Sequence, residues 1–95
     1  MSLKEAYEQK LQGQLDEWSA EIDKLKAKAD GAEADAQVEY YKKIKELRSM
    51  QDTAANKLTE LKDAGKDSWE DLKAGIDSSW DSLGNALKSA ASNFK

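Results

Sequence analysis

The sequence predicts an all-α protein, and three observations support this prediction. Bulky apolar residues recur at helical spacing along almost the whole chain. The chain contains no proline, the strongest helix breaker, and no segment alternates strictly between apolar and polar residues as an exposed strand would. Charged residues make up 36% of a sequence dominated by Ala, Leu, Lys, Glu, Asp and Ser, a composition typical of long helices and coiled coils. At 95 residues, we expect a single helical domain over residues 1–95.

The first predicted element is a long, coiled-coil-like amphipathic helix over residues 1–64. Its apolar positions first advance by alternating threes and fours, a heptad pattern, and then pass through two successive fours at Ala36, Tyr40 and Ile44. Such a stutter is expected where heptads give way to eleven-residue repeats. These apolar positions form a continuous stripe, which we call the seam. The residues that we expect at its helix interface are Leu11, Leu15, Trp18, Ile22, Leu25, Tyr40, Ile44, Leu47, Met50, Leu58 and Leu61.

Two architectures remain open at Gly31. Glycine suits the left-handed position that follows a helix, so the chain could turn here and form an up-down-up bundle of three helices of near-equal length. However, the surrounding sequence is rich in alanine, and the heptad phase crosses Gly31 without a slip. We therefore prefer a helix that continues through Gly31, about 90 Å long at 1.5 Å per residue, and keep the three-helix bundle as the alternative.

The strongest break in the pattern lies near Gly65, within KDAGKDSWED. Gly65 can follow a helix C-terminus, and Asp67 or Ser68 can cap the next helix. Glu70 or Asp71 would then complete a capping box. We expect a hinge at this point.

The C-terminal segment, residues 65–95, is predicted to form an amphipathic helix over residues 67–93. Its sequence repeats every eleven residues, as SWEDLKAGIDS, SWDSLGNALKS and, weakly, AASNFK, where Ala91 and Phe94 take the repeat positions. Eleven residues make three helical turns, so the bulky residues fall on one stripe. The opposite face is rich in serine, as in helices that bind lipid packing defects. The candidate lipid or partner face consists of Trp69, Leu72, Ile76, Trp80, Leu83, Leu87 and Phe94.

Composition argues against several classes of function. The chain has no histidine and no cysteine, which removes the commonest general base, thiolate nucleophiles and most zinc sites. The carboxylates are interspersed with lysines, as on a solvated helix face. We therefore expect no enzymatic activity, no catalytic residues, no cofactor and no metal site. The net charge of −4 is spread evenly and forms no basic patch, so we expect no nucleic-acid binding.

Three sequence blocks resemble a known family. WSAEID, EYYKKI and SWEDL, together with the segments around them, are similar to short bacterial coiled-coil proteins that are mostly hypothetical and are sometimes labelled stress-response proteins. The resemblance covers nearly the whole chain and brings no catalytic residues with it. It implies a bacterial helical protein with a stress connection. The eleven-residue period alone is also similar to that of desiccation-protection proteins and apolipoproteins.

These observations lead to an expected function and location. Many seam positions are only alanine, so a lone chain would bury a thin core, and we expect a homo-oligomer built on the seam. The expected role is a non-enzymatic self-association or protein-interaction module, with an unidentified protein partner also open. The alternative is binding to a lipid surface through the C-terminal helix. The polar N-terminus and the absence of a transmembrane-length apolar run favour the cytoplasm.

Overall fold

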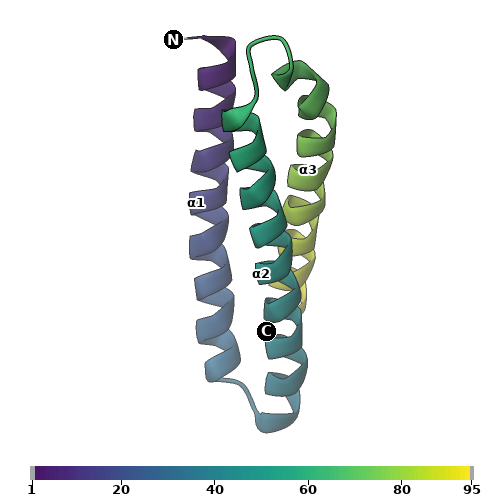
Figure 1. Ribbon diagram of the computed structural model, residues 1–95. Coiled ribbons are helices and arrows are strands. Elements are labelled where there is room, and N and C mark those ends of the chain that lie inside the picture. The colour runs from purple at the N-terminus through teal and green to yellow at the C-terminus, as the bar shows by residue number, and fades with distance from the viewer. Residues whose placement is uncertain (1, 95) are drawn as a thin grey trace.

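The computed structural model describes residues 2–94, and these form an up-down-up bundle of three α-helices (Figure 1). Helix α1 spans Leu3–Asp30, α2 spans Ala34–Asp63 and α3 spans Trp69–Asn93. The Cα trace measures 51 × 20 × 18 Å, so the bundle is about one long helix in length. Both α1 and α3 run antiparallel to α2 and therefore parallel to each other. The predicted all-α class is confirmed.

A side-chain cap begins α1. Ser2 has an extended backbone, and its hydroxyl oxygen accepts a hydrogen bond from the backbone N–H of Glu5 at 3.1 Å. The Ser2 hydroxyl also lies 3.3 Å from Oε1 of Glu5 and donates to it. This S-x-x-E arrangement satisfies one of the free N–H groups of the first turn and places a carboxylate near the positive end of the helix dipole.

The chain reverses direction directly after Asp30. Gly31 caps α1 and donates its backbone N–H to the carbonyl of Ala27 at 3.3 Å. The preferred prediction of one helix over residues 1–64 is therefore wrong at Gly31, and the three-helix alternative is the observed fold. Gly31 has φ −92°, so the left-handed cap considered from the sequence is not formed. The reversal lets the apolar stripes on either side of it bury each other within one chain.

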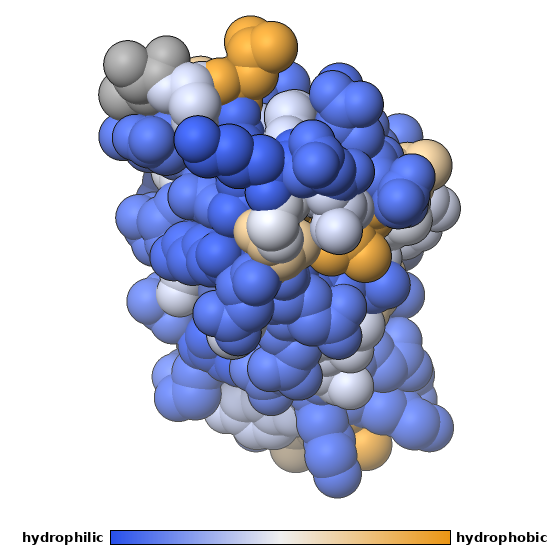
Figure 2. Space-filling model, turned by 45° about the horizontal axis from the view of Figure 1, so that its top comes forward, coloured by the Kyte–Doolittle hydropathy of each residue, from blue (hydrophilic) through white to orange (hydrophobic). Residues whose placement is uncertain are grey.

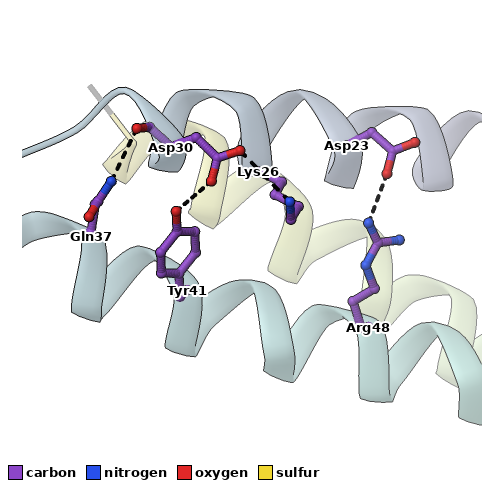
Figure 3. A network of polar contacts seen from close by, with 6 residues as sticks. All are labelled: Asp23, Lys26, Asp30, Gln37, Tyr41 and Arg48. Atoms are coloured by element: carbon purple, nitrogen blue, oxygen red, sulfur yellow. Dashed lines mark hydrogen bonds and ion pairs between the residues drawn. The ribbon is translucent and has the colours of Figure 1, made fainter.

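A polar network centred on Asp30 fixes this reversal (Figure 3). The Asp30 carboxylate accepts a hydrogen bond from the Tyr41 hydroxyl and lies 3.7 Å from the Lys26 ammonium. The Gln37 amide donates to the backbone carbonyl of Asp30 at 3.1 Å, satisfying an acceptor at the C-terminus of α1. These contacts hold the first two turns of α2 against the last turn of α1.

The second connection confirms the predicted hinge near Gly65 but not its predicted capping box. Helix α2 ends at Asp63, and the N–H groups of Ser68 and Trp69 both donate to the Gly65 carbonyl. Ser68 occupies the N-cap position of α3 with φ −93° and ψ −21°, and its side chain makes no capping hydrogen bond. A capping hydroxyl normally requires an extended backbone at this position, so the tight turn replaces the box.

Contacts at both ends of α2 close the bundle. At one end, the Lys4 ammonium donates to the Lys62 carbonyl at 3.1 Å and so ties the start of α1 to the end of α2. At the other end, the rings of Tyr40 and Phe94 stack with centroids 4.2 Å apart. These contacts, at opposite ends of a long bundle, fix the register of α1 and α3 on α2.

The core is a single apolar column along the bundle axis. Its centre is formed by the large side chains that are less than 2% exposed, Ile22 of α1, Leu47 and Leu61 of α2, and Leu83 of α3. Alanines fill the closest approaches between helices, because Ala29, Ala54 and Ala90 are also at most 1% exposed. Among the described residues, no polar or charged residue is buried. Stability therefore depends on apolar burial.

The buried leucines should dominate stability. We expect Leu25→Ala and Leu47→Ala each to lower the free energy of unfolding by about 2–5 kcal/mol, because each leaves a cavity in a packed core. The exposed control Lys28→Ala should change it by less than about 0.5 kcal/mol. Urea unfolding followed by circular dichroism measures all three. Equal shifts for the leucine and lysine variants would contradict the packing described above.

Candidate functional site

A groove of about 740 Å³ lies between α1 and α3. We call it the α1–α3 groove. The α1–α3 contact is the least extensive of the three helix pairs, which leaves this side of the bundle open. The groove is lined by Tyr7, Lys10, Leu11, Gln14, Trp18 and Glu21 of α1 and by Asp77, Trp80, Asp81, Gly84, Asn85, Leu87, Lys88 and Ala91 of α3.

Two tryptophans form the floor of the groove. The rings of Trp18 and Trp80 lie 6.5 Å apart and are tilted by 47°, within the usual range for interacting aromatic pairs. Trp80 is 4% exposed, whereas Trp18 is only partly buried against the core. A β-carbon added at Gly84 would lie 3.3 Å from the Trp18 ring. The glycine thus makes room for the indole between the helices.

The indole of Trp80 carries a polar atom without a partner. Its Nε1 is buried and donates no hydrogen bond to any of the described residues. Buried tryptophan N–H groups usually have an acceptor, and leaving one unsatisfied costs about 1–3 kcal/mol. The floor of the groove therefore gains apolar contacts but leaves the Trp80 N–H without a hydrogen bond.

Tyr7 organises the upper end of the groove. Its hydroxyl donates a hydrogen bond to the Asp77 carboxylate, and its ring lies 5.9 Å from that of Trp69 and 5.4 Å from the Lys73 ammonium. Partial burial and the hydrogen bond to Asp77 both raise the pKa of Tyr7 above its usual value. The hydroxyl therefore stays protonated and remains a donor that joins α1 to α3. Leu3, at 80% exposure, lies beside this cluster in a smaller pocket.

The rim of the groove carries charges of both signs. Lys10 and Glu21 stand on the α1 side, and Asp77, Asp81 and Lys88 stand on the α3 side. All five residues are exposed. Glu21 pairs with Lys24 of its own helix at 3.7 Å, and Asp77 accepts from Tyr7. Lys10, Asp81 and Lys88 form no ion pair with any described residue.

The described residues offer no other evident chemistry. Within residues 2–94, no three acidic side chains converge in a way that could hold a metal ion. No helix of that part of the chain is long and apolar enough to cross a membrane. The face of the molecule in Figure 2 is mostly hydrophilic, with small separated apolar spots. What the arrangement can do chemically is bind an apolar or amphipathic surface.

The structure places the predicted helix-interface residues between the helices of one chain. Trp18, Tyr40 and Met50 pack against the core while remaining partly exposed. The others are buried, and they are Leu11, Leu15, Ile22, Leu25, Ile44, Leu47, Leu58 and Leu61. The seam is thus covered by the chain's own helices, not by the partner chain that the sequence led us to expect there.

The predicted lipid or partner face of α3 also points into the bundle. Trp69 and Leu72 are partly buried against the core, and the remaining members, Ile76, Trp80, Leu83, Leu87 and Phe94, are buried. One repeat position is wrong, because Ala91 is exposed and Ala90 is buried in its place. Phe94, eleven residues after Leu83, is buried as the repeat predicts, so only the position of Ala91 departs from the repeat.

Sequence reasoning missed the groove itself. Its apolar floor belongs to the predicted stripes, but Lys10, Asp81 and Lys88 looked like ordinary solvated charges, and Gly84 looked like part of the repeat. The one available signal was Gly84 inside a strong helical pattern, since such a glycine costs about 1 kcal/mol relative to alanine. Comparisons with protein-family models, with curated proteins and with solved structures return no match to this chain.

The two glycines of α3 give a matched test of the groove floor. Gly75 has open space around its Cα, so we expect Gly75→Ala to raise the free energy of unfolding by about 0.5–1 kcal/mol through helix propensity. Gly84→Ala should gain less, because the Trp18 indole must move. In a Trp18→Phe background this deficit should shrink, as a double-mutant cycle would report. Equal gains at both glycines in the wild-type background would contradict the Trp18–Gly84 contact.

Proposed function

We propose that this protein is a non-enzymatic helical interaction module that associates with itself. The observation that carries the proposal is the α1–α3 groove, which remains open after the three apolar stripes have covered one another. Its floor offers Trp18 and Tyr7 in partly exposed positions. Tryptophan and tyrosine are enriched in the cores of protein interfaces, where they supply large contact areas with few rotatable bonds.

The non-enzymatic part of the proposal rests on the side chains available. A chain without histidine or cysteine must rely on its carboxylates and lysines for chemistry. The carboxylates on the groove rim, Glu21, Asp77 and Asp81, are all exposed. A general acid or base usually needs burial or a close charged neighbour to tune its pKa. The stress connection and the cytoplasmic location rest on the family resemblance and the sequence alone, and they stay predictions.

Self-association of this bundle needs a surface other than the seam. The sequence led us to expect a homo-oligomer in which one chain's seam is buried by another. With the seam residues already buried inside one chain, a second chain would have to use the surface that remains. The α1–α3 groove is the part of that surface with an aromatic floor.

Mass measurement in solution tests self-association directly. We expect light scattering coupled to size exclusion to give, at micromolar to millimolar concentrations, a mass that rises above the 10.6 kDa of one chain towards twice that value. Trp18→Ser should reduce association because it removes the exposed edge of the groove floor, while Val38→Ser, at an exposed apolar position of α2 outside the groove, is the control. A mass of one chain across the whole range would refute the proposal.

Lipid-surface binding by α3 is the second candidate, and one observation favours it. The ion pair between Arg48 and Asp23, at 2.7 Å, joins α1 to α2, whereas α3 is held to both other helices by apolar contact, the Tyr7–Asp77 hydrogen bond and the Tyr40–Phe94 stacking, without an ion pair among the described residues. The α3 stripe is buried, so lipid binding would require α3 to swing out about the Gly65 turn. Apolar burial in the bilayer surface would then replace apolar burial in the bundle.

Tryptophan fluorescence tests this second candidate. In a Trp18→Phe variant, which leaves Trp69 and Trp80 as the reporters, highly curved vesicles that contain brominated lipids should quench the emission, because Trp80 is already buried in the bundle and only insertion places it beside lipid. Binding should depend little on salt, because attraction would come from apolar burial and not from net charge. Flat, tightly packed vesicles should bind much less. No quenching with either vesicle type, with the helical signal intact, would exclude this role.

A further inference from the structure

The register of α1 and α3 brings the rim charges of the groove into a fixed pattern. The Tyr7–Asp77 hydrogen bond aligns the upper parts of the two helices, and the contact between Trp18 and Gly84 aligns them further down. Because α1 and α3 are parallel, residues that follow these contacts in the sequence lie further down the groove on both of its sides. The heights of the rim charges can therefore be compared across the groove.

At the upper level, the two sides of the groove carry opposite charges. Lys10 follows Tyr7 by one turn on α1, and Asp81 follows Asp77 by one turn on α3. The upper α1 corner is therefore basic, and the upper α3 corner, with two carboxylates, is acidic. Neither Lys10 nor Asp81 forms an ion pair within residues 2–94.

At the lower level the signs are reversed. Glu21 follows Trp18 by one turn on α1, and Lys88 follows Gly84 by one turn on α3. Lys10 and Glu21 are eleven residues apart on α1, about 16 Å along a helix, and Asp81 and Lys88 are seven residues apart on α3, about 10 Å. The four corners of the groove thus alternate in sign around an aromatic floor.

An alternating pattern of this kind is complementary to itself. If a two-fold axis runs along the helices, α1 of one copy faces α3 of the other, and Lys10 meets Asp81 while Glu21 meets Lys88. If the axis crosses the helices, α1 faces α1 in the opposite direction, and Lys10 meets Glu21 while Asp81 meets Lys88. Both arrangements pair every corner with an opposite charge, as a two-fold symmetric interface requires. A rim of one sign would repel a second copy.

From this complementarity we propose that the occupant of the α1–α3 groove is a second copy of the chain, docked groove to groove about a two-fold axis. The inference rests on the proposed self-association and adds the surface and the symmetry. The face bounded by the 51 Å length and 20 Å width of the Cα trace is large enough for the about 800 Å² per partner of a standard interface. Trp18 lies between the corners and supplies the apolar centre, and Tyr7 borders it at the upper end.

Complementary charge reversal tests the proposal. The acidic variant Lys10→Glu/Lys88→Glu and the basic variant Glu21→Lys/Asp81→Lys each give positions 10, 21, 81 and 88 one sign, while Asp77 keeps its hydrogen bond to Tyr7 in both variants. We expect each variant alone to self-associate at least about tenfold more weakly than the wild type, since attraction becomes repulsion at every corner. A one-to-one mixture of the two variants should form a heterodimer with wild-type affinity, as measured by light scattering and by native mass spectrometry.

Matched controls separate local pairing from overall charge. Each Lys→Glu change lowers the net charge by two, so the acidic variant goes from −4 to −8 and the basic variant, by the opposite changes, from −4 to 0. Lys42→Glu/Lys45→Glu and Asp52→Lys/Glu60→Lys make the same changes at exposed sites of α2, outside the groove. These α2 variants should self-associate like the wild type.

Two further variants identify the direction of the axis. Lys10→Glu/Asp81→Lys keeps every pair attractive only when α1 faces α3, and Lys10→Glu/Glu21→Lys does so only when α1 faces α1. We expect one of them to retain dimerisation and the other to lose it. Loss in both would overturn the two-fold arrangement.

Comparing the wild type with the groove variants distinguishes failure of the groove dimer from failure of self-association. A wild-type protein that stays monomeric refutes self-association and the groove dimer together. A wild type that associates, with groove variants that associate equally well, overturns the groove while leaving self-association in place. If the groove variants lose thermal stability but not association, the rim charges act only across the groove within one chain, and the proposal is likewise overturned.

Discussion

The burial of three apolar stripes against one another is the interaction on which the rest of this structure depends. In each helix the apolar pattern has a period of about 3.5 to 3.7 residues, close to one helical turn. The bulky residues of each helix therefore form one narrow stripe. The stripes meet at Ile22, Leu47, Leu61 and Leu83, the most completely buried large side chains of the described residues. With no buried polar residue among residues 2–94 to specify partners, register must be set at the ends of the helices and by the small residues between them.

The helices and their buried faces could be predicted from the sequence, but the reversal at Gly31 could not. A helix that continues and a helix that folds back both require the same apolar stripe on either side of the glycine. The alanines near the turn fit both readings, because Ala29 is buried while Ala32 and Ala36 are only partly so. What decides the reversal is a set of contacts centred on Asp30, and these join residues that look like solvent-exposed polar positions in the sequence (Figure 3).

The candidate site, too, could be predicted from the sequence only in part. Its floor was predicted, since Trp18 and Trp80 both belong to the apolar stripes. The charged residues of the rim were not predicted to belong to a site. Their arrangement across the groove depends on the register of α1 relative to α3, which the sequence does not give. That register depends on two short turns and on contacts such as Lys4 with the carbonyl of Lys62, which join residues far apart in the chain. Periodicity along one helix carries no information about such offsets.

Two features of the groove lower the stability of the bundle, so the groove is more than a gap left by imperfect packing. A glycine inside α3 costs about 1 kcal/mol of helix propensity relative to alanine, and the unpartnered Trp80 indole adds a further cost of desolvation. Filling the α1–α3 contact with alanine and leucine would avoid both costs and close the surface. Regions of lower local stability are where binding surfaces are usually found. The α1–α3 side combines that lower stability with exposed tryptophan and tyrosine edges, while the α1–α2 side is closed by Arg48–Asp23 and the Asp30 network. This asymmetry between the two sides of α1 is the reason for which we propose the α1–α3 side as the interaction surface.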